Sequence, residues 1–260
     1  MPSEHKPLLL TWQGHGRMAR IRHLCHAPIV EAVLDLRIVP LPQGRYATLR
    51  PTGHAFEKVE DVWTIEGPVS VGSTMEPVTT GTRQQVGYKC TWEGGRHVAL
   101  FRVDGFTFSR LAPYTTWDTV RAEAVALWQE YQALAGSPSV TRAALRYINR
   151  FALPGPVADL SAYLLRPPAA AEGVAGPITS FVTRVISHDE TSGADVAVAQ
   201  LSEQAQERNR LSLILDVDVF RLFDPPVAGD EAWSHFPTIH DAKNRAFFGS
   251  ITEQTAEMFA

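Results

Sequence analysis

Hydrophobic and polar positions alternate along several stretches of this chain, and each such stretch predicts a half-buried β-strand. In the first stretch, IVEAVLDLRIV at 29–39, aliphatic side chains occupy every second position from Val30 to Ile38, and three of the four positions between them carry a charge. Further strands are expected in QQVGYKCTW, HVALFRVDGFTFSRL, TRAALRYINRFALP, ITSFVTRVISH, DVAVAQLSE and RLSLILDVDVFRLF. Strands with one apolar and one polar face predict antiparallel sheet that is covered on one side.

Apolar positions at helical spacing predict helices between these strands. A short helix is expected at 54–63 and another at 157–165. A long helix is expected at 115–136, with Thr115 or Thr116 as its N-cap and Gly136 at its end. The C-terminal stretch 239–259 is expected to form one more long helix, and the preceding Pro237 suits a first helical turn.

The order of these elements repeats along the chain. VALFRVDGFTFSRL and LSLILDVDVFRLF both combine aliphatic alternation with Val-Asp and then Phe, and each precedes a helix with an early tryptophan, Trp117 or Trp233. A nearly constant offset between such features indicates an internal duplication. We therefore predict an α+β fold of two tandem β-α-β-β-β-α units, 28–137 and 138–260, with antiparallel sheet and long helices on one face. The two units should pack as one globular body behind a flexible tail, 1–27.

Composition narrows the class of protein. The 260 residues are 45% hydrophobic and 20% charged, with a net charge of −4, which is typical of a globular protein and gives no overall basic field for nucleic acid. The two cysteines, Cys25 and Cys90, argue against a disulfide framework, and no apolar run approaches the roughly 20 residues of a membrane helix. A cytoplasmic protein without a membrane partner is expected.

The polar faces of three predicted strands carry the charges that we single out for ligand binding. These residues are Asp35, Arg37, Arg142, Arg146, Arg150, Asp216 and Asp218. The arginines recur about 13 Å apart along one strand face. A guanidinium group can donate two parallel hydrogen bonds to a carboxylate or a phosphate. Three interpretations stay open: cross-strand Arg–Asp pairs, a groove that recognises an anion, or a divalent metal at Asp216 and Asp218, for which Asp-x-Asp alone is a weak signal. A second possible metal site would use His23, Cys25 and His26 as ligands, but residues so close in sequence are poorly spaced for a tetrahedral site. We assign no metal site.

A second group of polar residues falls on faces that should be buried. His240 and Asn244 share a helical row with Phe247 and Ile251, and Asn149 shares a strand face with Leu145 and Phe151. Buried amides need hydrogen-bond partners, so Asn149, His240 and Asn244 are predicted to be structural polar clamps. His240 lies near a helix start, which favours the neutral imidazole. The alternative is that His240 acts as an acid or base, or that Asn244 orients a ligand.

Four stretches, PIVEAVLDLR, FSRLAPYTTWD, LRYINR and AKNRAFFGSIT, resemble a sporadically distributed bacterial and phage family of uncharacterised proteins. The resemblance rests on the Pro-x-Val-Glu first strand, the Arg-Tyr-Ile-Asn-Arg central strand and the Asn-Arg-Ala-Phe C-terminal helix. It extends from Pro28 to Phe259. It implies the extent of the domain and the importance of RYINR and KNRAFF, and it implies no activity or cofactor.

The chain contains no Gly-x-Gly-x-x-Gly, Walker, Gly-x-Ser-x-Gly, His-Glu-x-x-His or Cys-x-x-Cys motif. We therefore expect a non-enzymatic sensor or regulatory protein, with a role in phage defence as one setting, that binds a small anionic ligand or a protein partner on its polar sheet face. No catalytic residue and no cofactor are assigned. The alternatives are an enzyme that acts on an anionic small molecule with His240, Arg146 and Arg150, and a nucleic-acid-binding accessory protein. Nucleic acid is the least favoured partner, and a homo-oligomer stays open.

Overall fold

The computed structural model describes residues 16–66, 69–70, 78–79, 82–154, 159–173, 178, 180–204 and 210–260. Within them, nine strands form one antiparallel sheet in the order β2-β5-β6-β7-β1-β8-β11-β10-β9. The strands are β1 (Ile29–Ile38), β2 (Lys58–Glu66), β5 (Thr82–Trp92), β6 (His97–Arg102), β7 (Gly105–Leu111), β8 (Val140–Pro154), β9 (Val182–Asp189), β10 (Ala194–Gln204) and β11 (Arg210–Val227). A separate two-stranded pair joins β3 (Val69–Ser70) to β4 (Val78–Thr79).

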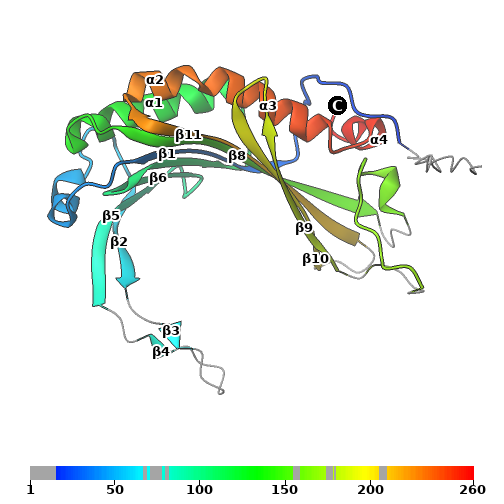
Figure 1. Cartoon of the computed structure of the whole chain (residues 1–260), viewed down its shortest axis with the longest axis horizontal. Helices are drawn as coiled ribbons and strands as arrows, with labels where there is room; N and C mark the ends of the chain where they lie inside the picture. The colour runs from blue at the N-terminus through cyan, green and yellow to red at the C-terminus, as the bar shows by residue number, and fades with distance from the viewer. Residues whose placement is uncertain are drawn as a thin grey trace, which may run out of the picture.

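The sheet is arched, and the helices lie on its convex side (Figure 1). These helices are α1 (Trp117–Ala135), α2 (Gly229–Ser234), α3 (Phe236–Phe248) and α4 (Glu253–Glu257), and 3-10 turns occur at Gln43–Leu49 and Leu160–Ala162. The two ends of the sheet, β2–β5 and β9–β10, bend away from the helices, so the concave face is open between them (Figure 1). The helices and the convex face of the sheet enclose the main core, in which Phe106, Trp128 and Tyr131 make mutual ring contacts.

The predicted pair of tandem β-α-β-β-β-α units with long helices is wrong. The structure is mostly a single nine-stranded antiparallel sheet, with few and mostly short helices. The two predicted segments meet inside this sheet, because β1 pairs along its length with β8. Side-chain alternation could not predict that strands of the two predicted units, 28–137 and 138–260, pair with each other. Pairing between strands far apart in sequence leaves no signal within either strand.

Several local predictions are confirmed. Ala32, Leu34 and Leu36 in β1 are buried, as the alternation requires. Helix α1 begins where expected, because Thr116 adopts an extended conformation and its hydroxyl accepts a hydrogen bond from the Thr119 backbone N–H at 3.2 Å. It ends at Gly136, whose left-handed φ of 80° suits glycine.

Three predicted helices are wrong. Most of 54–63 belongs to strand β2, whose β-branched and aromatic residues pair with β5. The segment 157–165 forms only the 3-10 turn Leu160–Ala162 within its described part. The C-terminal stretch is divided: α3 ends at Phe248, Ile251 and Thr252 form β-bridges with Leu164 and Met18, and α4 then begins. Buried backbone hydrogen bonds with these distant segments compete with a continuous helix.

Residues 17–27, which belong to the predicted flexible tail, are packed against the C-terminal part of the chain. The Ala19 N–H donates to the Ile251 carbonyl at 3.3 Å, and the His26 N–H donates to the Phe259 carbonyl at 3.1 Å. Ala19 and Leu24 are buried. The rest of the predicted tail, residues 1–15, lies outside the described residues. Among the described helices, none combines the length and apolar character needed to cross a membrane.

Candidate functional site

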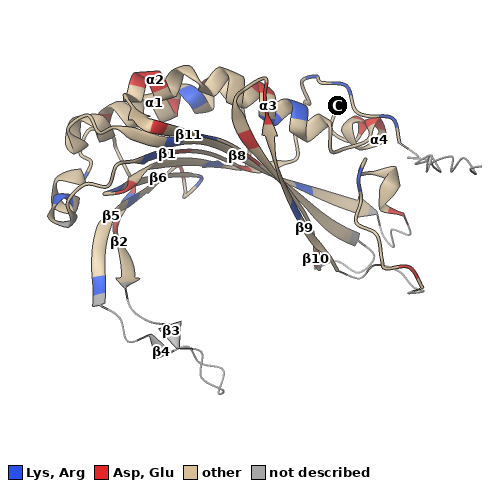
Figure 2. Ribbon diagram, in the orientation of Figure 1, with Lys and Arg blue, Asp and Glu red and all other residues tan. Residues whose placement is uncertain are grey.

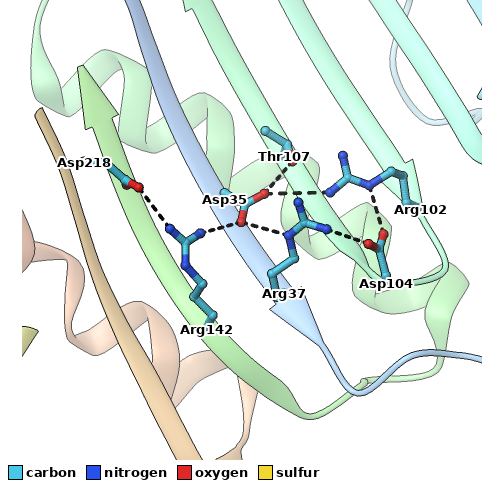
Figure 3. Close-up of polar contacts among 7 residues, drawn as sticks. All are labelled: Asp35, Arg37, Arg102, Asp104, Thr107, Arg142 and Asp218. Atoms are coloured by element: carbon cyan, nitrogen blue, oxygen red, sulfur yellow. Dashed lines mark hydrogen bonds and ion pairs between the residues drawn. The ribbon is translucent and has the colours of Figure 1, made fainter. Parts of the chain in front are cut away.

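Four of the seven predicted charged residues of the sheet face lie in one network around Asp35 (Figure 3); they are Asp35, Arg37, Arg142 and Asp218. Strand pairing places β1 between β7 and β8, so Asp35 lies opposite Thr107 on one side and Ala144 on the other. Its carboxylate accepts hydrogen bonds from the Thr107 hydroxyl at 2.8 Å, from Arg142 Nη1 at 3.0 Å and from Arg37 Nε at 3.2 Å. These contacts join three neighbouring strands through one side chain.

Arg142 extends the network to β11, because its Nη2 donates to Asp218 at 3.2 Å. At the opposite end, Arg37 and Arg102 both pair with Asp104 (Figure 3). Burial raises the pKa of the Asp218 carboxyl, and the nearby charges of Arg142 and Arg146 oppose this effect. Arg142 therefore offsets part of the effect of desolvation on this carboxyl.

Arg146 and Arg150 pair with other carboxylates further along β8. Arg146 makes a two-pronged contact with Asp216, at 2.8 Å and 2.6 Å, and this pairing raises the pKa of its guanidinium. Arg150 lies 3.3 Å from Glu203, which the sequence analysis did not single out. The predicted cross-strand Arg–Asp pairs are thus confirmed.

The arginines named on this polar sheet face all have carboxylate partners. Five guanidinium groups, Arg37, Arg102, Arg142, Arg146 and Arg150, face five carboxylates, Asp35, Asp104, Asp216, Asp218 and Glu203. Figure 2 shows both signs distributed over the sheet and the helices. An anion that bound one of these five guanidinium groups would have to compete with the carboxylate that already pairs with it. Within the described residues, no group of three or more His, Cys, Asp and Glu side chains is placed to hold a metal ion.

The opposite, convex face of the sheet carries a cavity of about 580 Å³. Its walls come from four segments: residues 21–29 of the packed N-terminal stretch, the start of α1, strand β8 and helix α3. The polar side chains that matter most here are Tyr114, Tyr147, Asn149, His240, Lys243 and Asn244. We call this cavity the Lys243 pocket. Its size lies within the range of small-molecule sites.

Lys243 is the most unusual group in this pocket. It is only 6% exposed, and its ammonium donates to Asn244 Oδ1 at 2.6 Å and lies 4.0 Å from the centre of the Tyr147 ring. No carboxylate among the described residues forms an ion pair with it, and no aspartate or glutamate lines the pocket within the described part of the chain. Burial lowers the pKa of Lys243 from 10.5 to about 7.

An aromatic wall lies beside this amine. The rings of Trp117 and His240 stack with centroids 4.5 Å apart and an angle of 8° between their planes. Burial, together with the neighbouring Lys243 charge, lowers the pKa of His240 to about 4, so its imidazole is neutral at physiological pH. The neutral state was expected from the helix start, but its main cause is desolvation.

A pair of tyrosines closes another side of the pocket. The hydroxyl groups of Tyr114 and Tyr147 lie 3.0 Å apart, and burial raises the pKa of both. Both phenols are therefore protonated at neutral pH and can pass a proton between them. They bring together the loop before α1 and the central strand β8.

The three predicted polar clamps all line this pocket, but in different ways. Asn149 is buried, and its amide donates to the backbone carbonyls of Tyr147 at 3.3 Å and Leu215 at 3.0 Å, which ties β8 to β11. Asn244 is half-buried and accepts from Lys243. His240 stacks on Trp117, and its Nδ1 lies 3.9 Å from Asp241 Oδ1.

The sequence analysis missed Lys243, although a signal was present. Ile239, Lys243 and Phe247 follow one another at four-residue spacing, so they share one face of a helix. The two apolar neighbours are buried and Lys243 is buried between them. A lysine in the middle of an apolar helical row is rare enough to identify a site.

Comparison of the chain with protein-family models, with curated proteins and with solved structures finds no match. The resemblance to the bacterial and phage family therefore stays a prediction.

Proposed function

We propose that this protein binds a small anionic organic molecule in the Lys243 pocket. The observation that carries the proposal is the buried Lys243 ammonium, which has an amide and a ring as neighbours and no carboxylate among the described residues. A buried ammonium without a counter-ion is costly, and a carboxylate or phosphate group at this place would supply the missing charge. The same binding would return the pKa of Lys243 toward its ordinary value.

The remaining walls suit an apolar or aromatic body attached to that anionic group. Trp117 presents a ring stacked on His240, and Phe247 and Phe248 also line the pocket. Small-molecule sites combine such apolar walls with a few convergent polar groups. The tyrosine hydroxyls and the amide of Asn244 can set the orientation of the ligand.

The Lys243 pocket and the polar sheet face differ in whether their positive charges have a carboxylate partner. On the polar sheet face each named guanidinium already has a carboxylate, whereas in the Lys243 pocket the cation has none. We therefore place the ligand on the convex side and assign the Asp35 network a structural role. Because Arg142, Arg146 and Arg150 already pair with carboxylates, they offer little free positive charge to a nucleic-acid backbone. The sensor, regulatory and defence roles stay predictions.

The proposal is tested by calorimetric titration with benzoate and with 3-phenyllactate, each compared with its neutral amide. We expect both acids to bind more tightly than their amides. At a pH above the pKa of Lys243, each should take up a proton on binding, because the anion stabilises the ammonium form.

Matched variants locate the binding site. Lys243→Met should weaken binding of both acids by tenfold or more, since about 1.4 kcal/mol corresponds to a factor of ten. Lys89→Met removes an exposed lysine from β5, and Arg146→Met removes a half-exposed arginine from the sheet face. Both controls should bind like the wild type. Equal binding of acid and amide, or loss of binding in Arg146→Met alone, would contradict the proposal.

A further inference from the structure

We infer that Lys243 forms an imine with the carbonyl carbon of an α-oxo acid bound in the Lys243 pocket. This inference rests on the proposed function, because the carboxylate of the α-oxo acid is the anionic group already assigned to this site. It adds a covalent step and restricts the ligand class to molecules with a carbonyl next to the carboxylate.

The geometry around the amine leaves it able to react. Lys243 lines the cavity, and its Nζ donates a hydrogen bond to Asn244 Oδ1 and contacts the ring of Tyr147. No carboxylate of the described chain holds it as an ammonium ion through an ion pair. Lysines that attack carbonyl groups are found in such desolvated settings.

The protonation state agrees with this geometry. A lysine with an ordinary pKa of about 10.4 has roughly one amine in a few thousand neutral at pH 7, whereas Lys243, with a pKa of about 7, has about half. The titratable groups that line the pocket around it are Arg22, His23 and Cys25 on the N-terminal segment, Tyr114, Tyr147 on β8, and His240 on α3. None is a carboxyl group, so none favours the ammonium form.

The reaction is a condensation without redox change. The lone pair of neutral Nζ forms a bond to the carbonyl carbon, the carbonyl π pair moves to oxygen, and a proton passes from nitrogen to that oxygen. The resulting hydroxyl group takes a second proton and leaves as water, while the nitrogen lone pair forms the C=N bond. The Tyr114–Tyr147 hydroxyl pair and the neutral imidazole of His240 are the groups in the pocket that can carry these protons.

The ligand carboxylate would then neutralise the iminium that it adjoins. A protonated imine is a buried cation, as the ammonium was, and it has the same need for a counter-ion. An α-oxo acid supplies both groups at once, because its carboxylate is bonded to the reacting carbon. A simple aldehyde would leave the iminium charge unpaired, so the pocket should favour α-oxo acids over aldehydes of the same size.

The test is reductive trapping in the wild-type protein, so it does not depend on the folding of a variant. The protein is incubated with phenylpyruvate or with pyruvate and sodium cyanoborohydride, and adducts are located by peptide mass spectrometry. We expect the main adduct on Lys243, formed roughly a hundredfold faster than on the exposed Lys58 and Lys89 in the same sample, because about half of the Lys243 amine is neutral at pH 7. The rate should rise with pH through about 7 and then level off.

Unlabelled 3-phenyllactate, which has the same carboxylate and ring but a hydroxyl in place of the carbonyl, should suppress the adduct by competition. If 3-phenyllactate binds and neither oxo acid gives an adduct, the imine is excluded and the binding function stands. If adducts spread evenly over Lys58, Lys89 and Lys243 and 3-phenyllactate does not suppress them, the imine is also excluded. If nothing binds and nothing reacts, both the imine and the proposed function fail.

Discussion

Replacing Lys243 with methionine is expected to raise the free energy of unfolding at neutral pH by about 2–4 kcal/mol, because one pKa unit corresponds to about 1.4 kcal/mol. Methionine keeps the apolar stem and removes an ammonium whose pKa burial lowers from 10.5 to about 7. The variant also loses the contact of the charge with the Tyr147 ring, which offsets part of the gain, by about 0.5–2 kcal/mol.

The pH dependence identifies the cause of this gain. Between the folded pKa of about 7 and the unfolded value of 10.5, the unfolded chain binds more protons at Lys243 than the folded chain. The contribution of Lys243 to stability therefore rises with pH, by about 2 kcal/mol from about pH 7 to about pH 9. The advantage of Lys243→Met should shrink over the same window.

Urea denaturation at several pH values measures the difference in unfolding free energy between the wild type and Lys243→Met. The contributions of the other titrating groups are the same in both proteins, so they cancel in this difference. Lys89→Met, at an exposed position, should give a curve parallel to that of the wild type. Parallel curves for Lys243→Met as well would mean that Lys243 is not desolvated in the folded protein. A destabilising residue at the centre of a pocket is typical of a position kept for function rather than for stability.

The second large effect is expected for Arg142→Met, which should destabilise the protein by about 2–3 kcal/mol. Arg142 lies between Asp35 and Asp218, whose side chains are only 13% and 22% exposed. Removing the guanidinium leaves two shielded carboxylates without their shared partner. Arg150→Met is the matched control: Arg150 and its partner Glu203 are 51% and 42% exposed, so loss of this pair should cost about 1 kcal/mol or less.

Acid should reduce the deficit of Arg142→Met. Burial already raises the pKa of Asp218, and loss of Arg142 removes a charge that lowers it. A carboxyl whose folded pKa lies above its unfolded pKa contributes less stability as the pH rises through that range. The deficit should therefore be largest near neutral pH and smaller near the unfolded pKa, about 4. Adding Asp218→Asn should recover part of it, whereas equal small effects in Arg142→Met and Arg150→Met would contradict the structural role of the network.

The strands were predictable from the sequence where burial of one face leaves a regular alternation, as in β1. The segment 54–63 was not, because Val59, Val62 and Trp63 fit a helical stripe and a short strand equally well. The division of the C-terminal helix depends on bridges from Ile251 and Thr252 to residues far away in sequence. Periodicity within one segment contains no information about such partners.

The candidate site was likewise only partly predictable from the sequence. The pairing of Arg142 and Arg146 with aspartates could be predicted, since their strands carry opposite charges on matching faces. The Lys243 pocket could not be assembled, because Trp117, Tyr147 and Lys243 come from three elements and its outer wall comes from the segment expected to be a free tail. His240 and Asn244, which were singled out from the sequence, lie on the same helix as Lys243.

The most direct test is an NMR titration of the Lys243 side chain, through its ¹³Cε and ¹⁵Nζ resonances, with and without saturating benzoate. We predict a pKa of about 7 for the free protein and a clear upward shift when benzoate is bound, because the carboxylate stabilises the ammonium in the pocket. A pKa near the ordinary value of about 10.4 that benzoate does not change would contradict the account, since Lys243 would then be neither desolvated nor in contact with the anion.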